Sequence, residues 1–441
     1  MKNKVIILGA AGRDFHNFNV VYRTDPNTEV VAFTATQIPD IDGRMYPPAL
    51  AGEFYPAGIP IKAEEELEAL IKKFGVDECV LSYSDLPYDT VMHLGSRVMA
   101  AGCKFSMLGS YPTMIKSTKP VVSVTAIRTG CGKSQTTREV VRSLMGMGLK
   151  TASIRHPMPY GDLEKQKVQR FAELADLKKH ECTIEEMEEY EPHIEMGSII
   201  YSGVDYEAIL REAEKEADVI IWDGGNNDMP FYKPDISIVV VDPLRPGHEI
   251  GYYPGEVNLR MADVVVMNKI DSAYPEDMEI VLDNIREYNP KAKVILAASS
   301  ILVDNPELIN GKRVLVVEDG PTLTHGEMDL GAGTVAARRY GAVELIDPRP
   351  YIVGKLEETF EKYPEIGSLL PAMGYGEQQM KDLEATIANT ECESVVIGTP
   401  INLGRFIKID KPNTRVYYEL VEISSPKIAD ILKVEIPKIN K

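Results

Sequence analysis

The chain has 441 residues, of which 44% are hydrophobic, and this length predicts two or three globular domains. The net charge of −19, without a basic stripe, argues against nucleic acid and anionic membrane as partners. The five cysteines are scattered, the N-terminus begins directly with a strand rather than a signal peptide, and no apolar run approaches the roughly 20 residues of a membrane span. We therefore expect a cytoplasmic protein.

Residues 1–118 alternate between strand and helix patterns. Strands are predicted at 4–8, 29–33, 79–82 and 104–108, with helices at 63–74 and 90–101. This alternation predicts a Rossmann-like domain. The turn after the first strand is polar and holds Arg13 and His16, but it lacks the full G-x-G-x-x-G pattern, which disfavours a nicotinamide dinucleotide.

The segment 121–137, VVSVTAIRTGCGKSQTT, carries the strongest signal. A buried strand over 121–127 leads into a glycine-containing loop and a helix that runs to Leu144. Strand, loop, Gly-Lys-Ser and helix are typical of a phosphate-binding loop, although Ile127 replaces its usual first glycine. We expect the thiol of Cys131 to be partly exposed. The predicted nucleotide ligands in this segment are Thr129, Gly130, Cys131, Gly132, Lys133, Ser134 and Gln135.

Later strand ends supply the other parts of a nucleotide site. The strand over 218–222 ends in Asp223, the position of a carboxylate that holds Mg²⁺ together with Ser134. The strand over 151–155 ends in Arg155 and His156, which with Lys133 and Asp223 are the predicted catalytic residues.

A fourth strand end reads Asn268-Lys269-Ile270-Asp271. N-K-x-D after a strand is the pattern with which P-loop GTPases recognise guanine, so these residues are predicted to bind the base. The motif favours GTP, and the sequence leaves the choice between ATP and GTP open.

The remaining segments are less specific. The charged stretch 163–195 is predicted to be mostly a solvated helix face, with His180 and His193 in no metal-binding pattern. Residues 301–441 are predicted to add α/β structure that packs on the P-loop sheet, after domains at 1–118 and 119–300. His325, nearby glycine-rich turns and Arg338-Arg339 suggest a phosphate-binding patch.

Four segments in this order, GAAGRDFHNFN, TGCGKSQTTR, WDGGNND and EDGPTLTHGEMDLGAG, resemble the cyclic 2,3-diphosphoglycerate synthetase family. The resemblance spans nearly the whole chain. It implies ATP-dependent closure of an intramolecular phosphoanhydride in 2,3-bisphosphoglycerate by a homodimer, which gives cyclic 2,3-diphosphoglycerate, ADP and phosphate. ATP is therefore favoured over GTP as the co-substrate. Such an anionic substrate needs cations, for which the candidates are Arg13, His16, Arg128, Arg155 and His156. The alternative is a P-loop GTPase with a regulatory or metallochaperone role.

Overall fold

A computed structural model describes residues 2–35, 43–157, 161–225, 228–319, 331–363, 366–372, 377–399 and 401–439. The chain forms two compact units. The first contains Met1–His180, Pro192–Ala298 and Glu422–Lys441, and the second contains Glu181–Glu191 and Ser299–Val421. Among the described residues, no helix is long and apolar enough to cross a membrane.

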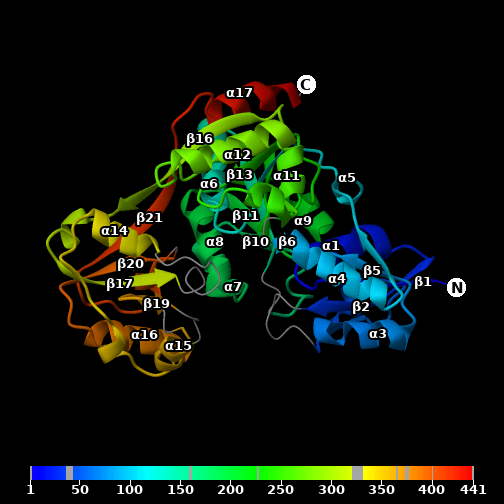
Figure 1. The fold of residues 1–441 in the computed structure, drawn as a ribbon, viewed down its shortest axis with the longest axis horizontal. Coiled ribbons are helices and arrows are strands. Elements are labelled where there is room, and N and C mark those ends of the chain that lie inside the picture. Colours follow the sequence, from blue (N-terminus) through cyan, green and yellow to red (C-terminus); the bar gives the residue numbers. More distant parts are fainter. Residues whose placement is uncertain are drawn as a thin grey trace. The chain divides into compact units, whose positions relative to one another are not determined.

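The N-terminal part of the first unit is built on a six-stranded sheet, drawn mostly in blue in Figure 1. The strand order is β3-β4-β2-β1-β5-β7, and all neighbours pair in parallel except β3 and β4. Its elements are β1 (Asn3–Leu8), α1 (Arg13–Asn17), a π-helical turn (Phe18–Tyr22), β2 (Thr28–Ala35), β3 (Met45–Tyr46), α2 (Pro48–Ala51), β4 (Ile59–Ala63), a 3-10 turn (Glu64–Glu66), α3 (Leu67–Phe74), β5 (Glu78–Leu81), α4 (Tyr88–Ala100) and β7 (Lys104–Met107).

Both faces of this sheet are buried, as the continuous apolar strands predict. Val5 and Ile7 of β1 belong to a core with the side chains of α1 and the π-helical turn, whereas Ile6 and Leu8 belong to a core with α3 and α4. Since β1 has β2 on one side and β5 on the other, the carboxyl ends of β1 and β5 form the topological switch point where such sheets bind ligands. This confirms the predicted Rossmann-like front.

The rest of the first unit is built on a second, larger sheet. Its strand order is β10-β11-β9-β12-β8-β13-β15-β16, parallel except for β10 with β11. The strands are β8 (Val121–Ala126), β9 (Thr151–Arg155), β10 (Gln169–Phe171), β11 (Ile199–Ser202), β12 (Val219–Asp223), β13 (Ile236–Val241), β15 (Val264–Met267) and β16 (Lys293–Val303).

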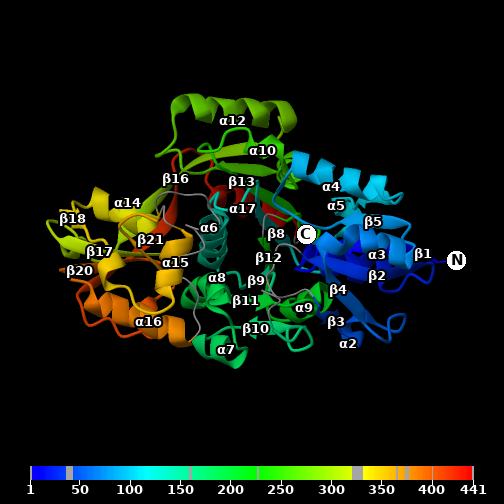
Figure 2. The same ribbon diagram turned by 60° about the horizontal axis from the view of Figure 1, so that its bottom comes forward.

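Helix α6, which follows the phosphate loop, packs against β8 and β12 at the centre of this sheet, as Figure 2 shows, and α17 packs on α6. The predicted P-loop sheet is therefore confirmed, whereas the C-terminal helix α17 had no prediction. The helices are α5 (Ser110–Thr113), α6 (Lys133–Gly146), α7 (Leu174–Lys179), α9 (Tyr206–Ala213), α10 (His248–Gly251), α11 (Gly255–Met261), α12 (Pro275–Tyr288) and α17 (Ile428–Ile439). Helix α8 (Ile184–Glu195) begins in the second unit and ends in the first.

A short ribbon connects the two parts of the first unit. Strand β6 (Leu86–Pro87), in the loop after β5, pairs antiparallel with β14 (Tyr252–Tyr253), which follows α10. The loop at the switch point of the first sheet is thereby tied to a loop of the P-loop sheet.

The second unit has its own apolar core, and its strands pair in parallel. Strands β21, β20, β17 and β18 follow one another, and β19 also pairs with β17. The elements are a 3-10 turn (Pro306–Leu308), β17 (Arg313–Asp319), α14 (Ala332–Arg339), β18 (Glu344–Leu345), a 3-10 turn (Arg349–Tyr351), α15 (Leu356–Lys362), β19 (Leu370–Ala372), α16 (Glu377–Asn389), β20 (Ser394–Gly398), a 3-10 turn (Leu403–Arg405) and β21 (Asn413–Glu422). His325 lies outside the described residues.

The charged stretch 163–195 differs from its prediction. It contains β10 as well as α7 and α8, and the carboxylates of Glu186 and Glu191 are buried rather than solvated. Glu186 accepts the backbone N–H of Thr183, and Glu191 pairs with Arg405, so each charge has a hydrogen-bonding partner.

Candidate active site

The phosphate loop connects β8 to α6 and has the backbone that its glycines predict. Gly130 and Gly132 have φ of 84° and 101°, a left-handed conformation that side chains disfavour. A Cβ on Gly132 would also lie 2.0 Å from Nδ2 of Asn268. Cys131 is fully buried, which corrects the expected partial exposure, and burial raises the pKa of its thiol to about 12. Cys131 is therefore a packing residue.

Three polar side chains converge on Asp223 at the carboxyl end of β12. Lys133 forms an ion pair with Oδ1, the hydroxyl of Thr137 donates to Oδ1 at 2.9 Å, and Nη1 of Arg155 donates to Oδ2 at 2.9 Å. Although burial alone would raise the pKa of Asp223, the charges of Lys133 and Arg155 lower it well below its usual value. Asp223 is thus an ionised carboxylate next to the phosphate loop.

Ser134 and Gln135 occupy the second and third positions of α6, one turn before Thr137. Hydroxyl and carboxylate oxygens are the donors that Mg²⁺ prefers, so the hydroxyl groups of α6 and the ionised Asp223 fit this ion. When bound, Mg²⁺ would neutralise phosphate charge.

His193 is a neighbour of Asp223 that sequence reasoning placed on a solvated helix. It is buried, its Nε2 lies 3.9 Å from Oδ2 of Asp223 and its Nδ1 lies 3.3 Å from Oγ of Ser153. Burial lowers its pKa to about 4, so the ring is neutral at pH 7. Its position was not predictable, because a lone histidine in a charged helix carries no pattern.

The N-K-x-D segment holds the phosphate loop from the other side. Asn268 donates to the carbonyl of Cys131 at 3.0 Å, and the ammonium of Lys269 pairs with buried Asp242 at 2.9 Å. Arg245 also pairs with Asp242 and donates to the carbonyl of Thr129 at 2.9 Å. Asp271 is exposed, two residues beyond Lys269.

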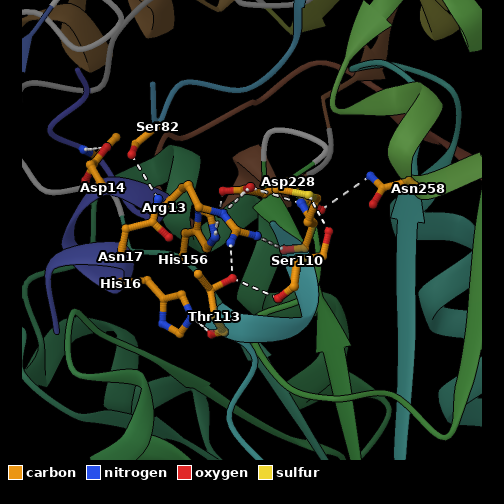
Figure 3. Close-up of polar contacts among 12 residues, drawn as sticks. Arg13, Asp14, His16, Asn17, Ser82, Ser110, Thr113, His156, Asp228 and Asn258 are labelled. Carbon is orange, nitrogen blue, oxygen red and sulfur yellow. Dashed lines mark hydrogen bonds and ion pairs between the residues drawn. The ribbon is translucent and has the colours of Figure 1, made fainter. Parts of the chain in front are cut away.

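Arg13 of the front domain contacts the loop between β12 and β13. Its Nε pairs with Oδ1 of Asp228 at 2.8 Å, Nη2 donates to the carbonyl of Met229 at 2.6 Å and Nη1 donates to Thr113 at 3.2 Å (Figure 3). The guanidinium also lies 4.5 Å from the ring centroid of Phe231. Arg13 and Asp228 are both buried, so this ion pair joins the two parts of the first unit without contact with water.

Two histidines stack on the same aromatic ring. The centroids of His16 and His156 lie 4.1 Å and 4.9 Å from that of Phe231. Burial, and then nearby arginine charges, lower the pKa of His156 to about 3 and that of His16 well below its usual value. Both rings are therefore neutral at pH 7. Nε2 of His16 lies 2.6 Å from the carbonyl of Thr113, which requires a proton on that nitrogen.

The switch-point turn touches this cluster directly. A Cβ on Gly12 would lie 2.6 Å from Nδ1 of His156, so the turn and the histidine pack without space for a side chain. Asp14, in the same turn, is buried and accepts the backbone N–H of Ala11 and of Phe15. Burial raises its pKa to about 7. Asn17 donates to Oγ of Ser82, at the end of β5 (Figure 3).

Arg128, at the entrance of the phosphate loop, pairs with Asp85 of the front domain at 3.0 Å. Asp85 had no prediction, although an aspartate shortly after a strand is the signal that identified Asp223. Thr137 could have been found from its i+4 spacing to Lys133, which places both on one face of α6.

A parallel sheet with a phosphate loop, an ionised aspartate at a strand end and a Rossmann-like front domain in contact with the loop together define a P-loop nucleotide-binding protein. The P-loop domain of the cyclic 2,3-diphosphoglycerate synthetase family matches residues 195–298. Arginine synthetase ArcE from Thermococcus kodakarensis is 62% identical over 98% of this chain and 96% of its own length. The chain therefore belongs to the family of this arginine synthetase, and its P-loop domain matches that of cyclic 2,3-diphosphoglycerate synthetase, as its motifs predicted.

More distant proteins are also similar. A cyclic 2,3-diphosphoglycerate synthetase from Methanosphaera stadtmanae is 20% identical over 53% of this chain and 50% of its own. The crystal structure of LpxK from Aquifex aeolicus in complex with ATP aligns with 83% of this chain and 98% of its own, at 11% identity and a TM-score of 0.46.

Proposed function

We propose that this protein is an ATP-dependent synthetase that forms arginine by replacing the oxygen of a ureido group with nitrogen. The observation that carries the proposal is the 62% identity, over nearly the full length of both chains, to a protein named arginine synthetase. Arginine differs from its ureido analogue, citrulline, only in this replacement, and a P-loop site is suited to activating the oxygen by phosphoryl transfer.

The proposed reaction has two steps. The ureido oxygen attacks the terminal phosphoryl group of ATP and ADP leaves, which makes the oxygen part of a phosphate leaving group. Ammonia then adds to the ureido carbon and phosphate departs with the original oxygen, while one proton from the nitrogen passes to the phosphate. Citrulline, ammonia and ATP thus give arginine, ADP and phosphate.

The residues of the first unit have separate roles in this scheme. Lys133 would leave Asp223 to bind the outer phosphates, while Ser134 and Asp223 would hold Mg²⁺. The acceptor would bind at the switch point between β1 and β5, near Asp14 and Asn17. A carboxyl group with a pKa of about 7 can gain and lose a proton at neutral pH, which suits Asp14 to the proton transfer of the second step.

The charge balance of the site supports this acceptor over a bisphosphate. Arg13 pairs with Asp228 and Arg155 with Asp223, and burial keeps His16 and His156 neutral. The predicted cations are thus largely compensated, whereas a bisphosphate brings about five negative charges. An uncharged ureido group needs no excess of positive charge in the site.

Closure of cyclic 2,3-diphosphoglycerate is the second candidate, favoured by the match of residues 195–298 to that family's P-loop domain. In this reaction, one substrate phosphate takes the terminal phosphoryl group of ATP. The neighbouring phosphate then attacks the bound phosphate of the new anhydride and expels inorganic phosphate. Asn268, from the segment predicted to recognise guanine, contacts the phosphate loop, so GTP is compared with ATP as the co-substrate.

One assay separates these candidates. The purified protein is incubated with Mg²⁺ and either ATP or GTP, with citrulline and ammonium, with 2,3-bisphosphoglycerate, or with neither, and products are read by phosphorus NMR and amino-acid analysis. We expect arginine and ADP in equal amounts only with citrulline and ammonium. A cyclic product would establish the second candidate. GTP hydrolysis that ignores both acceptors would favour the regulatory GTPase and overturn the proposal.

A further inference from the structure

Asp85 has an unusual backbone for its position. It lies between β5 and the β6–β14 ribbon, and its φ of 60° places a residue other than glycine in the left-handed region. Such a conformation costs about 1–3 kcal/mol and persists where surrounding contacts enforce it. Here the Asp85 carboxylate makes hydrogen bonds to the phosphate loop that can hold this backbone in place.

The two oxygens of this carboxylate have different partners. Oδ1 accepts Nε of Arg128 at 3.0 Å. Oδ2 accepts the hydroxyl of Thr129 at 2.7 Å and the backbone N–H of Thr129 at 3.3 Å. Backbone N–H groups of such a loop are the donors that surround the phosphates of a nucleotide. Oδ2 therefore occupies donors that a phosphate oxygen would use.

Arg128 is held at three points. Besides Asp85, its Nη1 lies 3.2 Å from Nδ1 of His248, and its guanidinium stacks 3.9 Å from the ring centroid of Tyr252. Tyr252 pairs with Pro87, two residues after Asp85, so the ribbon keeps Asp85 and Arg128 together even when Oδ2 changes partner. Oδ1 of Asp85 thus keeps its bond to Arg128, whereas Oδ2 can give up its bonds to Thr129.

We propose that Asp85 is a positioning residue for phosphoryl transfer, which holds Arg128 at the entrance of the phosphate loop through Oδ1 and yields the Thr129 donors at Oδ2 to a nucleotide phosphate. The front domain thereby sets the geometry of the loop and the position of a cation beside the transferred group. This proposal rests on nucleotide binding by the loop and does not depend on the identity of the acceptor.

The test uses Asp85→Asn and Asp85→Gly, because asparagine and glycine both tolerate the left-handed backbone. Asp89→Asn is the matched control: it removes the same charge from an exposed carboxylate at the start of α4. Binding of ATP and ADP is measured by calorimetry, and turnover is measured with whichever acceptor the wild-type protein uses.

Removing the competing carboxylate should tighten nucleotide binding by about tenfold, since a hydrogen bond to a charged group is worth about that factor. Loss of the Arg128 anchor should at the same time lower kcat by at least about tenfold. A purely structural Asp85 would instead give weaker binding in both variants. Weaker binding, or binding and kcat equal to those of Asp89→Asn, would overturn the proposal. Failure of the arginine assay alone would leave the binding result standing.

Discussion

Replacement of Arg13 by methionine tests whether the front domain and the P-loop sheet are joined by a buried ion pair. The change removes the 2.8 Å pair with Asp228, the 2.6 Å hydrogen bond to Met229 and the stacking on Phe231, while keeping most of the apolar volume. Asp228 is then left buried without its cation. Breaking a buried pair in this way costs about 3–5 kcal/mol of unfolding free energy.

The assay is urea unfolding followed by the fluorescence of Trp222, the single tryptophan of the chain. Trp222 is fully buried and its ring lies 4.4 Å from that of Phe231, so its emission reports the unfolding of the region that contains the pair. The variants are Arg13→Met, Asp228→Leu and the double variant. Because the double variant removes both charges, its destabilisation should be less than the sum of the single effects by about 2 kcal/mol or more.

A control cycle uses Lys215 and Glu212, an exposed i,i+3 pair at the end of α9 with Nζ and Oε1 2.6 Å apart. Its coupling should be about 0.5 kcal/mol or less, because water screens both charges. A coupling energy for Arg13 and Asp228 no larger than this control would refute the view that the pair joins the two parts of the unit.

Three further changes test single residues. Lys133→Ala should lower kcat by more than about 100-fold, because it removes the cation that binds the outer phosphates. Trp222 fluorescence should show that the variant keeps the native fold. Unchanged turnover would contradict the assignment of the phosphate loop. Asp271→Asn should weaken GTP binding by about tenfold and leave ATP binding unchanged if guanine is read there, and calorimetry with both nucleotides decides this. Burial raises the pKa of Asp14 from 3.8 to about 7, so its proton contributes stability that is present below pH 4 and is lost as the pH rises to 7. Asp14→Asn should remove this decline. His156 and His193 change the stability in the opposite direction, but they do so in both proteins, so their effect cancels when the free energies of urea unfolding are subtracted. A difference in unfolding free energy that stays constant between pH 4 and 8 would contradict the buried carboxyl.

The sequence predicted the elements of the fold because its signals are local. The alternation of apolar strands with helices defined both sheets, and Gly130 and Gly132 predicted a loop whose positive φ angles the structure confirms. Cys131 was placed wrongly because its position in a loop suggested exposure, whereas Asn268 and Arg245 cover the loop from distant strands. Side-chain direction within a loop is decided by such neighbours and not by the loop sequence.

The partners of the charged residues could not be predicted for the same reason. Arg13 was recognised as a candidate site residue, but its pairing with Asp228 joins positions 215 residues apart. His193 and Asp85 reach the site only because α8 and the β6–β14 ribbon bring them there. A motif therefore located the nucleotide site, while tertiary contacts set its charge balance and with it the class of acceptor that we propose.

Transfer of oxygen from the acceptor to phosphate is the most direct test of the central claim, which is that the nucleotide activates a ureido oxygen. The protein is incubated with ATP, ammonium and citrulline labelled with oxygen-18 at the ureido group, and the released phosphate is examined by phosphorus NMR. We predict one labelled oxygen in each phosphate and none in ADP. Phosphate that forms without the label would contradict the account.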